Sequence, residues 1–365
     1  MKKPRERAMQ ASDIHFETTE FLDSSGKLLR PLPAMLSSRD QLVELYRVMV
    51  QTRVFDRAAI NLQRTGEMGT YPSNEGQEAI GAGIGYAMQD DDVLVPYYRD
   101  IATQIQRGVL LEEILRYWGG DEWGMHFRHQ AEDFPVSVPI ATQACHAVGI
   151  GYAIRYRQQA RAVVTTCGDG ATSKGDFYES INIAGVMGLP VVFVVNNNRW
   201  AISVPLEKQT AAPTIAHKAL AAGIDGYRVD GNDAVAMVQV MSDALQQARA
   251  HRRPSIVEAL SYRLGDHTTA DDANRYRPRE ELEAARALEP LIRYKAYLQA
   301  GHDWSDDDDE SLYADCVAEA RSAIEVYRAF PPQPAGEFFD YMYARPTADL
   351  EKQKQEWLTQ VKRHG

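Results

Sequence analysis

The sequence is poor in cysteine, has no long apolar run and carries no excess of positive charge. Its three cysteines, at positions 145, 167 and 316, show no spacing typical of a disulfide framework or a zinc site, so we expect a reducing, cytoplasmic setting. No apolar stretch approaches the ~20 residues that span a bilayer, and no apolar segment follows the basic start to make a signal peptide. With 40 Lys and Arg against 51 Asp and Glu, the net charge of -11 argues against nucleic acid as a partner.

What is present is the composition of a large globular protein. Hydrophobic residues make up 44% of the 365 positions, which is enough for a substantial core. Strand-length apolar runs alternate with helical patterns, which predicts an α/β fold with a doubly wound parallel sheet and a helical C-terminal extension. We expect an N-terminal arm over 1–37, the α/β domain over 38–280 and a helical region over 281–365.

Local signals predict several boundaries. Ser38 is a candidate N-cap for a first long helix, and small residues over 79–85 indicate that a second helix packs closely on its neighbours. Further helices are expected over 144–159, 176–189 and 234–250, and strands over 162–167, 191–195, 227–230 and 255–264. Residues 118–136 lack periodicity and predict a long loop, in which no further ligands complete a metal site with His126 and His129. Trp357, Leu358 and Val361 are expected to dock a last helix.

One strand–helix–strand unit, residues 162–198, is typical of a binding site. Asp169 follows the first strand and Asn198 follows the second, and the carboxyl ends of parallel strands meet at one edge of a sheet. A carboxylate and an amide carbonyl are the hard oxygen ligands that Mg²⁺ prefers, together with a substrate's phosphates. Gly168 and Gly170 would let a diphosphate approach the backbone closely.

The competing interpretation is that Gly168–Gly170 and Asn196–Asn198 are only turns, and either tripeptide alone favours it. Two other phosphate-binding motifs are excluded, because each lacks a residue that the motif requires. Ser173 stands where a dinucleotide motif needs its third glycine, and Asp176 stands where a phosphate loop needs lysine. The pairing of the two tripeptides across a strand–helix–strand unit is much more specific than either alone.

The blocks GDGATSKGDFYESINIAG and VVNNNRWAIS resemble the thiamine-diphosphate motif of the 2-oxoacid dehydrogenases. More narrowly, the chain is similar to the alpha subunit of their decarboxylating component, of the pyruvate or branched-chain type. The resemblance runs from about Leu42 to Trp304 and includes four more blocks in order, which are GQEAIGAG (76–83), PYYRD (96–100), IATQ (140–143) and GDHTTADDANRYRP (265–278).

The resemblance implies a set of site residues. Asp169, Asn198 and the backbone carbonyl of Trp200 would hold Mg²⁺, and His267 would be the catalytic group, acting as an acid or hydrogen-bond donor to the substrate. Thr142 and Gln143 match positions that bind K⁺ in some relatives. Other cofactor-binding positions implied are Tyr98 and Arg99 for the diphosphate, Val138 and Ile140 for the aminopyrimidine, and Gly168, Gly170 and Ala171 in the turn itself.

The resemblance also implies partners. The glutamate that the cofactor's pyrimidine ring needs belongs to a separate beta subunit in this family, so we expect an α₂β₂ heterotetramer that passes its acyl group to a lipoyl-bearing acyltransferase. Tyr71 and Pro72 beside GQEA lean toward pyruvate as the 2-oxoacid, with branched-chain acids or acetoin as alternatives. An NAD-dependent dehydrogenase and a noncatalytic binding protein are more distant alternatives. Thr268 stands where eukaryotic relatives have a phosphorylated serine, which disfavours that regulation here.

Overall fold

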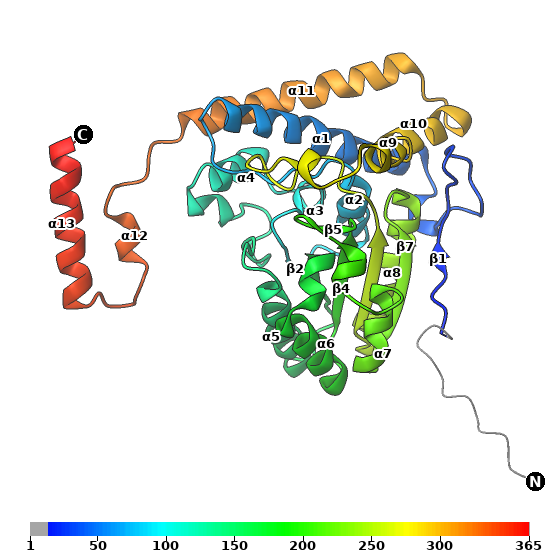
Figure 1. Ribbon diagram of the computed structural model, residues 1–365, viewed down its shortest axis with the longest axis horizontal. Coiled ribbons are helices and arrows are strands. Elements are labelled where there is room, and N and C mark those ends of the chain that lie inside the picture. The colour runs from blue at the N-terminus through cyan, green and yellow to red at the C-terminus, as the bar shows by residue number, and fades with distance from the viewer. Residues whose placement is uncertain (1–13, 365) are drawn as a thin grey trace, which may run out of the picture.

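The computed structural model describes residues 14–364, so the basic start of the chain lies outside the described residues. Its centre is a sheet of six parallel strands in the order β1-β7-β8-β4-β3-β2 (Figure 1). The strands are β1 (Thr18–Thr19), β2 (Val93–Val95), β3 (Val163–Gly168), β4 (Val191–Asn197), β7 (Asp225–Asp230) and β8 (Ser255–Leu260). The predicted doubly wound parallel sheet is confirmed, and its strands all end at the same edge.

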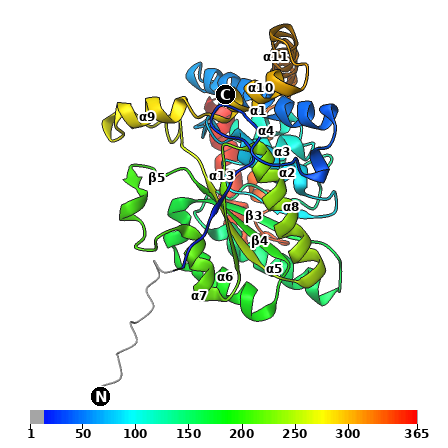
Figure 2. The same cartoon turned by 90° about the vertical axis from the view of Figure 1, so that its right-hand side faces the viewer.

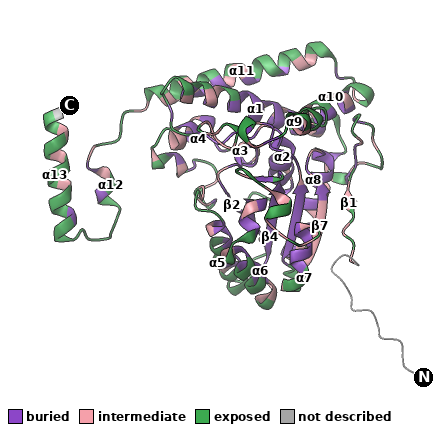
Figure 3. Ribbon diagram, in the orientation of Figure 1, coloured by how far each residue is buried: buried purple, intermediate pink, exposed green. Residues whose placement is uncertain are grey.

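Helices cover both faces of this sheet, which is why its central strands are apolar at nearly every position. In β4, Val191, Phe193 and Val195 belong to one core cluster, whereas Val192 and Val194 belong to the other. The first face is covered by α5 (Thr142–Tyr156), α6 (Gly175–Met187) and α7 (Lys218–Ala222), and the second by α8 (Ala234–His251) with α2 (Glu78–Ala87) packed on it. Figure 3 shows the central strand β4 buried between these layers, whereas β7 is partly of intermediate burial.

A second helical layer lies beyond α2. It is built on α1 (Arg39–Arg64), which Ser38 caps as predicted, through a capping box with Gln41. The remaining helices are α3 (Ile101–Gln106), α4 (Leu111–Trp118), α9 (Arg279–Arg286), α10 (Pro290–Gly301), α11 (Asp306–Ala329), α12 (Glu337–Asp340) and α13 (Ala348–His364). The helix α11 lies along α1, and α9 projects from the body (Figures 1 and 2).

The last helix stands away from the body of the molecule (Figure 1). Trp357 of α13 donates to the carbonyl of Ala335 and packs against Phe338, and Leu358 lies near Gly336. Trp357 and Leu358, two of the three predicted docking residues, therefore hold α13 against the α12 segment. None of the described helices is both long and apolar enough to cross a bilayer.

Close packing of α2 is also as predicted. A Cβ on Gly81 would lie 2.6 Å from the Cβ of Ala102 in α3, and one on Gly83 would lie 2.5 Å from the Cβ of Met237 in α8. The small residues therefore let α2 approach helices of its own chain.

Several boundaries differ from expectation: the strand expected over 255–264 ends at Leu260, and the helix expected over 144–159 is Thr142–Tyr156. Two other differences have tertiary reasons. The N-terminal arm contributes β1, which pairs with β7 although Thr18 and Thr19 carry no apolar pattern. The strand β4 runs two residues further than expected, because the side chains of Asn196 and Asn197 find buried acceptors on Gln77 and Glu258. The proposed domain boundaries at 37/38 and 280/281 stay predictions.

Candidate functional site

A cavity of about 210 Å³ opens at the carboxyl edge of the sheet, just past the ends of β2, β3, β4 and β8. This is where open α/β sheets bind ligands. Its lining residues are Tyr97, Tyr98, Arg99, Ser137, Ile140, Ala141, Gln143, Gly168, Asp169, Gly170, Ala171, Asn198, Trp200, Ala201, Ile202 and His267.

The structure thus brings nearly all predicted site residues to one cavity, although they come from segments far apart in the chain. Tyr98, Arg99, Ile140, Gly168, Asp169, Gly170, Ala171, Asn198, Trp200 and His267 all line it. Val138 does not, and its side chain is 49% exposed. Gln143 lines the cavity, while Thr142 begins α5 behind it. His126 and His129 lie on the exposed loop, and no group of three or more His, Cys, Asp or Glu side chains suited to a metal occurs within residues 14–364.

Asp169 and Asn198 face the cavity from the ends of β3 and β4. Asp169 is 1% exposed, and its Oδ2 accepts a hydrogen bond of 2.6 Å from Nε2 of Gln209. Burial raises the pKa of Asp169 to about 6, with the Gln209 bond opposing that shift. Nδ2 of Asn198 donates to Gln77 at 3.1 Å, so the side-chain oxygen of Asn198 is the atom of this amide that can bind a cation. One carboxylate and one amide oxygen on neighbouring strand ends fit Mg²⁺ and not a soft metal.

Three buried arginines lie in this region, and one of them, Arg99, lines the cavity. Arg99, Arg263 and Arg277 are 3%, 1% and 9% exposed. Arg99 donates to the carbonyls of Ser73 and His267, and Arg263 donates to those of Trp200 and Ile202 and to the hydroxyl of Tyr276. Arg277 donates to three backbone carbonyls of the 263–265 segment.

No carboxylate within the described part of the chain comes within 4.0 Å of these guanidinium groups. Burying a cation without a counter-charge is costly, because carbonyl dipoles replace only part of its hydration. A cavity lined by one such cation, Arg99, with a second, Arg263, in contact with its lining residues is therefore typical of an anion site.

His267 lies between two of these arginines. Its Nδ1 is 3.4 Å from Nη2 of Arg99 and 3.4 Å from Nη1 of Arg263. Since guanidinium nitrogens only donate, Nδ1 is the acceptor and the imidazole proton sits on Nε2. Burial lowers the pKa of His267 to about 4, and the charges of Arg99 and Arg263 add to that effect, while Asp271 opposes it. The neutral ring can therefore donate a hydrogen bond from Nε2 at physiological pH.

The turn after β3 presents backbone to the cavity. An ideal Cβ on Gly168 would meet no atom within 4 Å, so a side chain there would project into open space. A Cβ on Gly170 would lie 2.5 Å from the Cβ of Ala201, so glycine lets this turn pack against the hairpin of β5 (Trp200–Ala201) and β6 (Val204–Pro205). The strand end, the exposed backbone and the buried cations together fit a diphosphate with its metal ion.

Several residues of the site were missed by the sequence interpretation. Arg263 and Gln209 touch predicted site residues but belong to no recognised block, and their roles depend on long-range contacts. Ala141 and Ile202 line the cavity with φ of 65° and 55°. Left-handed backbone at a residue other than glycine is costly and is concentrated at functional sites, but a sequence does not reveal it.

Comparison with known proteins identifies the family. The profile of the family described as "Dehydrogenase E1 component" matches residues 46–334, well over half of the chain. The chain belongs to the dehydrogenase E1 component family. Among the curated relatives of this E1 chain is the "3-methyl-2-oxobutanoate dehydrogenase subunit alpha" of Mycobacterium tuberculosis, 42% identical over 321 residues, which are 87% of each protein.

Two further relatives of the E1 chain carry a different substrate in their names. The "Pyruvate dehydrogenase E1 component subunit alpha" of Bacillus subtilis is 36% identical over 337 residues, covering 92% of this chain and 91% of the relative. The protein of the same name from Mycoplasma genitalium is 35% identical over 333 residues, covering 91% and 93%. The predicted resemblance to alpha subunits of the pyruvate or branched-chain type is confirmed, and the NAD-binding alternative is set aside.

Proposed function

We propose that this chain is the alpha subunit of a 2-oxoacid dehydrogenase, which decarboxylates its substrate with thiamine diphosphate and passes the acyl group to a lipoyl carrier. The observation that carries the proposal is the cavity itself, whose lining combines Asp169 and Asn198 with Arg99, a buried arginine that has no carboxylate partner within residues 14–364. An anion with a bound metal ion would pair with the arginine through its negative charge and with the oxygens of Asp169 and Asn198 through its metal. Membership of the E1 family supports the choice of thiamine diphosphate as that anion.

The residues that would hold the cofactor follow from their chemistry. Asp169 and Asn198 would ligate Mg²⁺, with the carbonyl of Trp200 as a further ligand by family resemblance, and Arg99 and Arg263 would offset the charge of the diphosphate. Thiamine diphosphate, when bound, supplies the carbanion chemistry that decarboxylation requires. Oε1 of Gln143 is buried and has no hydrogen-bond partner among the described residues, which supports the proposed K⁺ site near Thr142 and Gln143.

His267 is proposed as the group that contacts the 2-oxoacid. With Nδ1 facing two guanidinium groups, Nε2 keeps its proton and can donate to an oxygen of the substrate. The low pKa argues for a neutral donor rather than an imidazolium acid in the free protein. An anion bound beside Arg99 and Arg263 would offset their charge and raise that pKa.

The beta subunit is the proposed partner at the mouth of the cavity. Apolar side chains are exposed there and on the neighbouring outer face of α5 and α6, where few would be expected in a lone chain. They are Val138, Ile140, Tyr152, Tyr156, Ile183, Val186 and Ile202. The proposed assembly is an α₂β₂ heterotetramer in which the beta subunit completes the site and a lipoyl-bearing acyltransferase accepts the acyl group.

Two substrate classes are compatible with the relatives. The identity of 42% to a 3-methyl-2-oxobutanoate dehydrogenase subunit, against 35% and 36% to two pyruvate dehydrogenase subunits, favours a branched-chain acid over pyruvate. The sequence motif beside Tyr71 leaned the other way, so a direct comparison is needed.

The test is to purify the chain alone and with its co-expressed beta subunit. Thermal shifts with thiamine diphosphate plus Mg²⁺, against NAD, test the cofactor. Release of CO₂ from pyruvate and from 3-methyl-2-oxobutanoate tests the substrate. We expect a shift with thiamine diphosphate only, and CO₂ release only from the mixed preparation. Stabilisation by NAD instead, or strong CO₂ release by the alpha chain alone, would contradict the proposal.

A further inference from the structure

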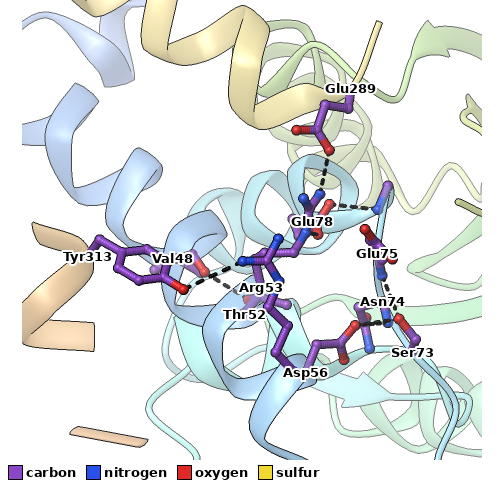
Figure 4. Close-up of polar contacts among 12 residues, drawn as sticks. Val48, Thr52, Arg53, Asp56, Ser73, Asn74, Glu75, Glu78, Glu289 and Tyr313 are labelled. Atoms are coloured by element: carbon purple, nitrogen blue, oxygen red, sulfur yellow. Dashed lines mark hydrogen bonds and ion pairs between the residues drawn. The ribbon is translucent and has the colours of Figure 1, made fainter. Parts of the chain in front are cut away.

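Asp56 is a buried carboxylate on α1 that lies outside the cavity and is only 1% exposed. Its Oδ1 accepts a hydrogen bond of 2.6 Å from Oη of Tyr71. Its Oδ2 accepts two more of 2.6 Å, from Oγ of Ser73 and from the backbone amide of Asn74. Figure 4 shows the carboxylate pointing from the helix to Ser73 and Asn74.

This arrangement is costly and fixes the geometry of a short segment. Burial raises the pKa of Asp56, although its hydrogen bonds and Arg99 oppose that shift, so the charge is held with a desolvation cost. Hydrogen bonds to a carboxylate are about twice as strong as neutral ones. Three of them within four residues leave the 71–74 segment little freedom relative to α1.

The opposite side of the same segment supports the cavity. The carbonyl of Ser73 accepts a hydrogen bond from Nη1 of Arg99. Tyr71 bonds twice to Thr269, with its amide donating to Oγ1 at 3.1 Å and its carbonyl accepting from the Thr269 amide at 3.0 Å. A Cβ on Gly265 would lie 3.3 Å from Oγ of Ser73, so the start of this loop also passes close to the segment.

The 71–74 segment therefore connects Asp56 to both Arg99 and the loop that carries His267. We propose that Asp56 is a positioning residue, which sets where Arg99 and His267 stand in the cavity without touching the ligand itself. The expected effect on cofactor binding rests on the proposed function. The effect of Asp56 on the positions of Arg99 and His267 concerns this chain alone. Asp56 lies 43 positions before Arg99 and 211 before His267, and it belongs to none of the blocks that resemble the family motif.

The test compares Asp56→Asn with a matched control, Asp233→Asn. Asp233 is equally buried and also accepts three hydrogen bonds, from the amides of Phe21, Leu22 and Ala236, but it joins the N-terminal arm to α8 and does not line the cavity. Both variants are expected to lower Tm. Each replaces a buried carboxylate, which only accepts hydrogen bonds, with an amide whose NH₂ group would face the donors that the carboxylate had bound. Only Asp56→Asn should change the site.

Two measurements report on the site. In the ligand-free full-length chain, the His267 ring resonance, assigned by its loss in His267→Gln, should move in Asp56→Asn and stay in place in Asp233→Asn. In the chain purified with its beta subunit, Kd for thiamine diphosphate with Mg²⁺ should rise about tenfold or more in Asp56→Asn alone, the scale seen for outer hydrogen-bond partners of metal sites. An unmoved resonance together with an unchanged Kd, in a folded Asp56→Asn protein, would overturn the inference.

Two milder variants keep the test decisive if Asp56→Asn does not fold. Tyr71→Phe and Ser73→Ala each remove one of the hydrogen bonds to Asp56, and each should move the His267 resonance by a smaller amount. No movement in either variant would overturn the inference. Failure of the parent to bind thiamine diphosphate would contradict the proposed function instead, and the ligand-free resonance would still decide the role of Asp56.

Discussion

Nε2 of Gln209 donates a hydrogen bond of 2.6 Å to Oδ2 of Asp169, the buried carboxylate at the end of β3. The same nitrogen donates to the carbonyl of Val204 at 2.9 Å, which ties the carboxylate to the β5–β6 hairpin. A side chain held on both sides in this way fixes the direction in which Asp169 offers its other oxygen. Such outer partners set the orientation of metal ligands.

The first prediction follows for Gln209→Leu, which keeps the size of the side chain and removes its donor. We expect Mg²⁺ to bind about ten- to a hundredfold more weakly in the presence of thiamine diphosphate. Calorimetric titration of Mg²⁺ at fixed cofactor measures this. Gln239→Leu is the control, because Gln239 also donates to an aspartate, Asp243, on the outer surface of α8. Equal Mg²⁺ affinity in both variants would show that Gln209 does not orient the metal ligand.

The second prediction concerns stability and pH at His267. The groups that face its ring are Arg99 and Arg263, the ring of Tyr98 and, on its own loop, Asp271. Its folded pKa of about 4 lies below the ordinary 6.5, so between these values the unfolded chain takes up a proton that the folded chain does not. This residue therefore lowers stability progressively as pH falls from about 6.5 toward 4.

His267→Gln removes that penalty. The Tm of the variant minus that of the parent should increase as pH falls from about 7 to about 5, measured without cofactor. His129→Gln, on the exposed loop, should show no such trend. A difference that stays constant over this range would mean that the folded and unfolded pKa values of His267 are alike.

The third prediction concerns Lys218, a buried lysine behind the turn that carries Asp169. Its Nζ donates to the carbonyl of Thr172 at 2.7 Å and to its hydroxyl at 3.0 Å, and it lies 4.8 Å from the ring centre of Tyr178. Lys218→Met keeps the apolar stem but leaves the Thr172 carbonyl without this donor. We expect a loss of about 1–3 kcal/mol in the free energy of unfolding, measured with urea.

The matched variant for Lys218 is Lys295→Met. Lys295 pairs with Asp306 and Asp309 at a more exposed position, where such pairs contribute about 0–1 kcal/mol. Lys218→Met should also weaken binding of thiamine diphosphate, whereas Lys295→Met should not. Equal losses of stability and no change in binding would show that Lys218 does not support the turn.

The strand-end geometry of Asp169 and Asn198 could be predicted because a strand–helix–strand unit fixes where both residues lie. The roles of Arg99 and His267 came from the family resemblance, since no local pattern in the sequence assigned them. Arg263, Gln209 and Asp56 could not be found, because each acts through a side chain that meets residues far away in sequence. The same limit applies to β1, a strand that exists through pairing with β7 rather than through its own two threonines.

The last prediction concerns the charge of the site in the free chain. Arg99, Arg263 and Arg277 are buried at or behind the cavity. Among residues 14–364 their partners are carbonyl and hydroxyl oxygens and Nδ1 of His267, so no carboxylate there offsets their positive charge. Inorganic diphosphate should therefore bind the ligand-free protein and raise its Tm, corresponding to about 2.7 kcal/mol at a concentration a hundred times its Kd. The effect should be absent in Arg263→Met, which removes one of the cations. It should be retained in Arg279→Met, whose side chain lies on the exposed helix α9 and pairs with Glu283. An equal rise of Tm in both variants would place diphosphate binding elsewhere on the protein.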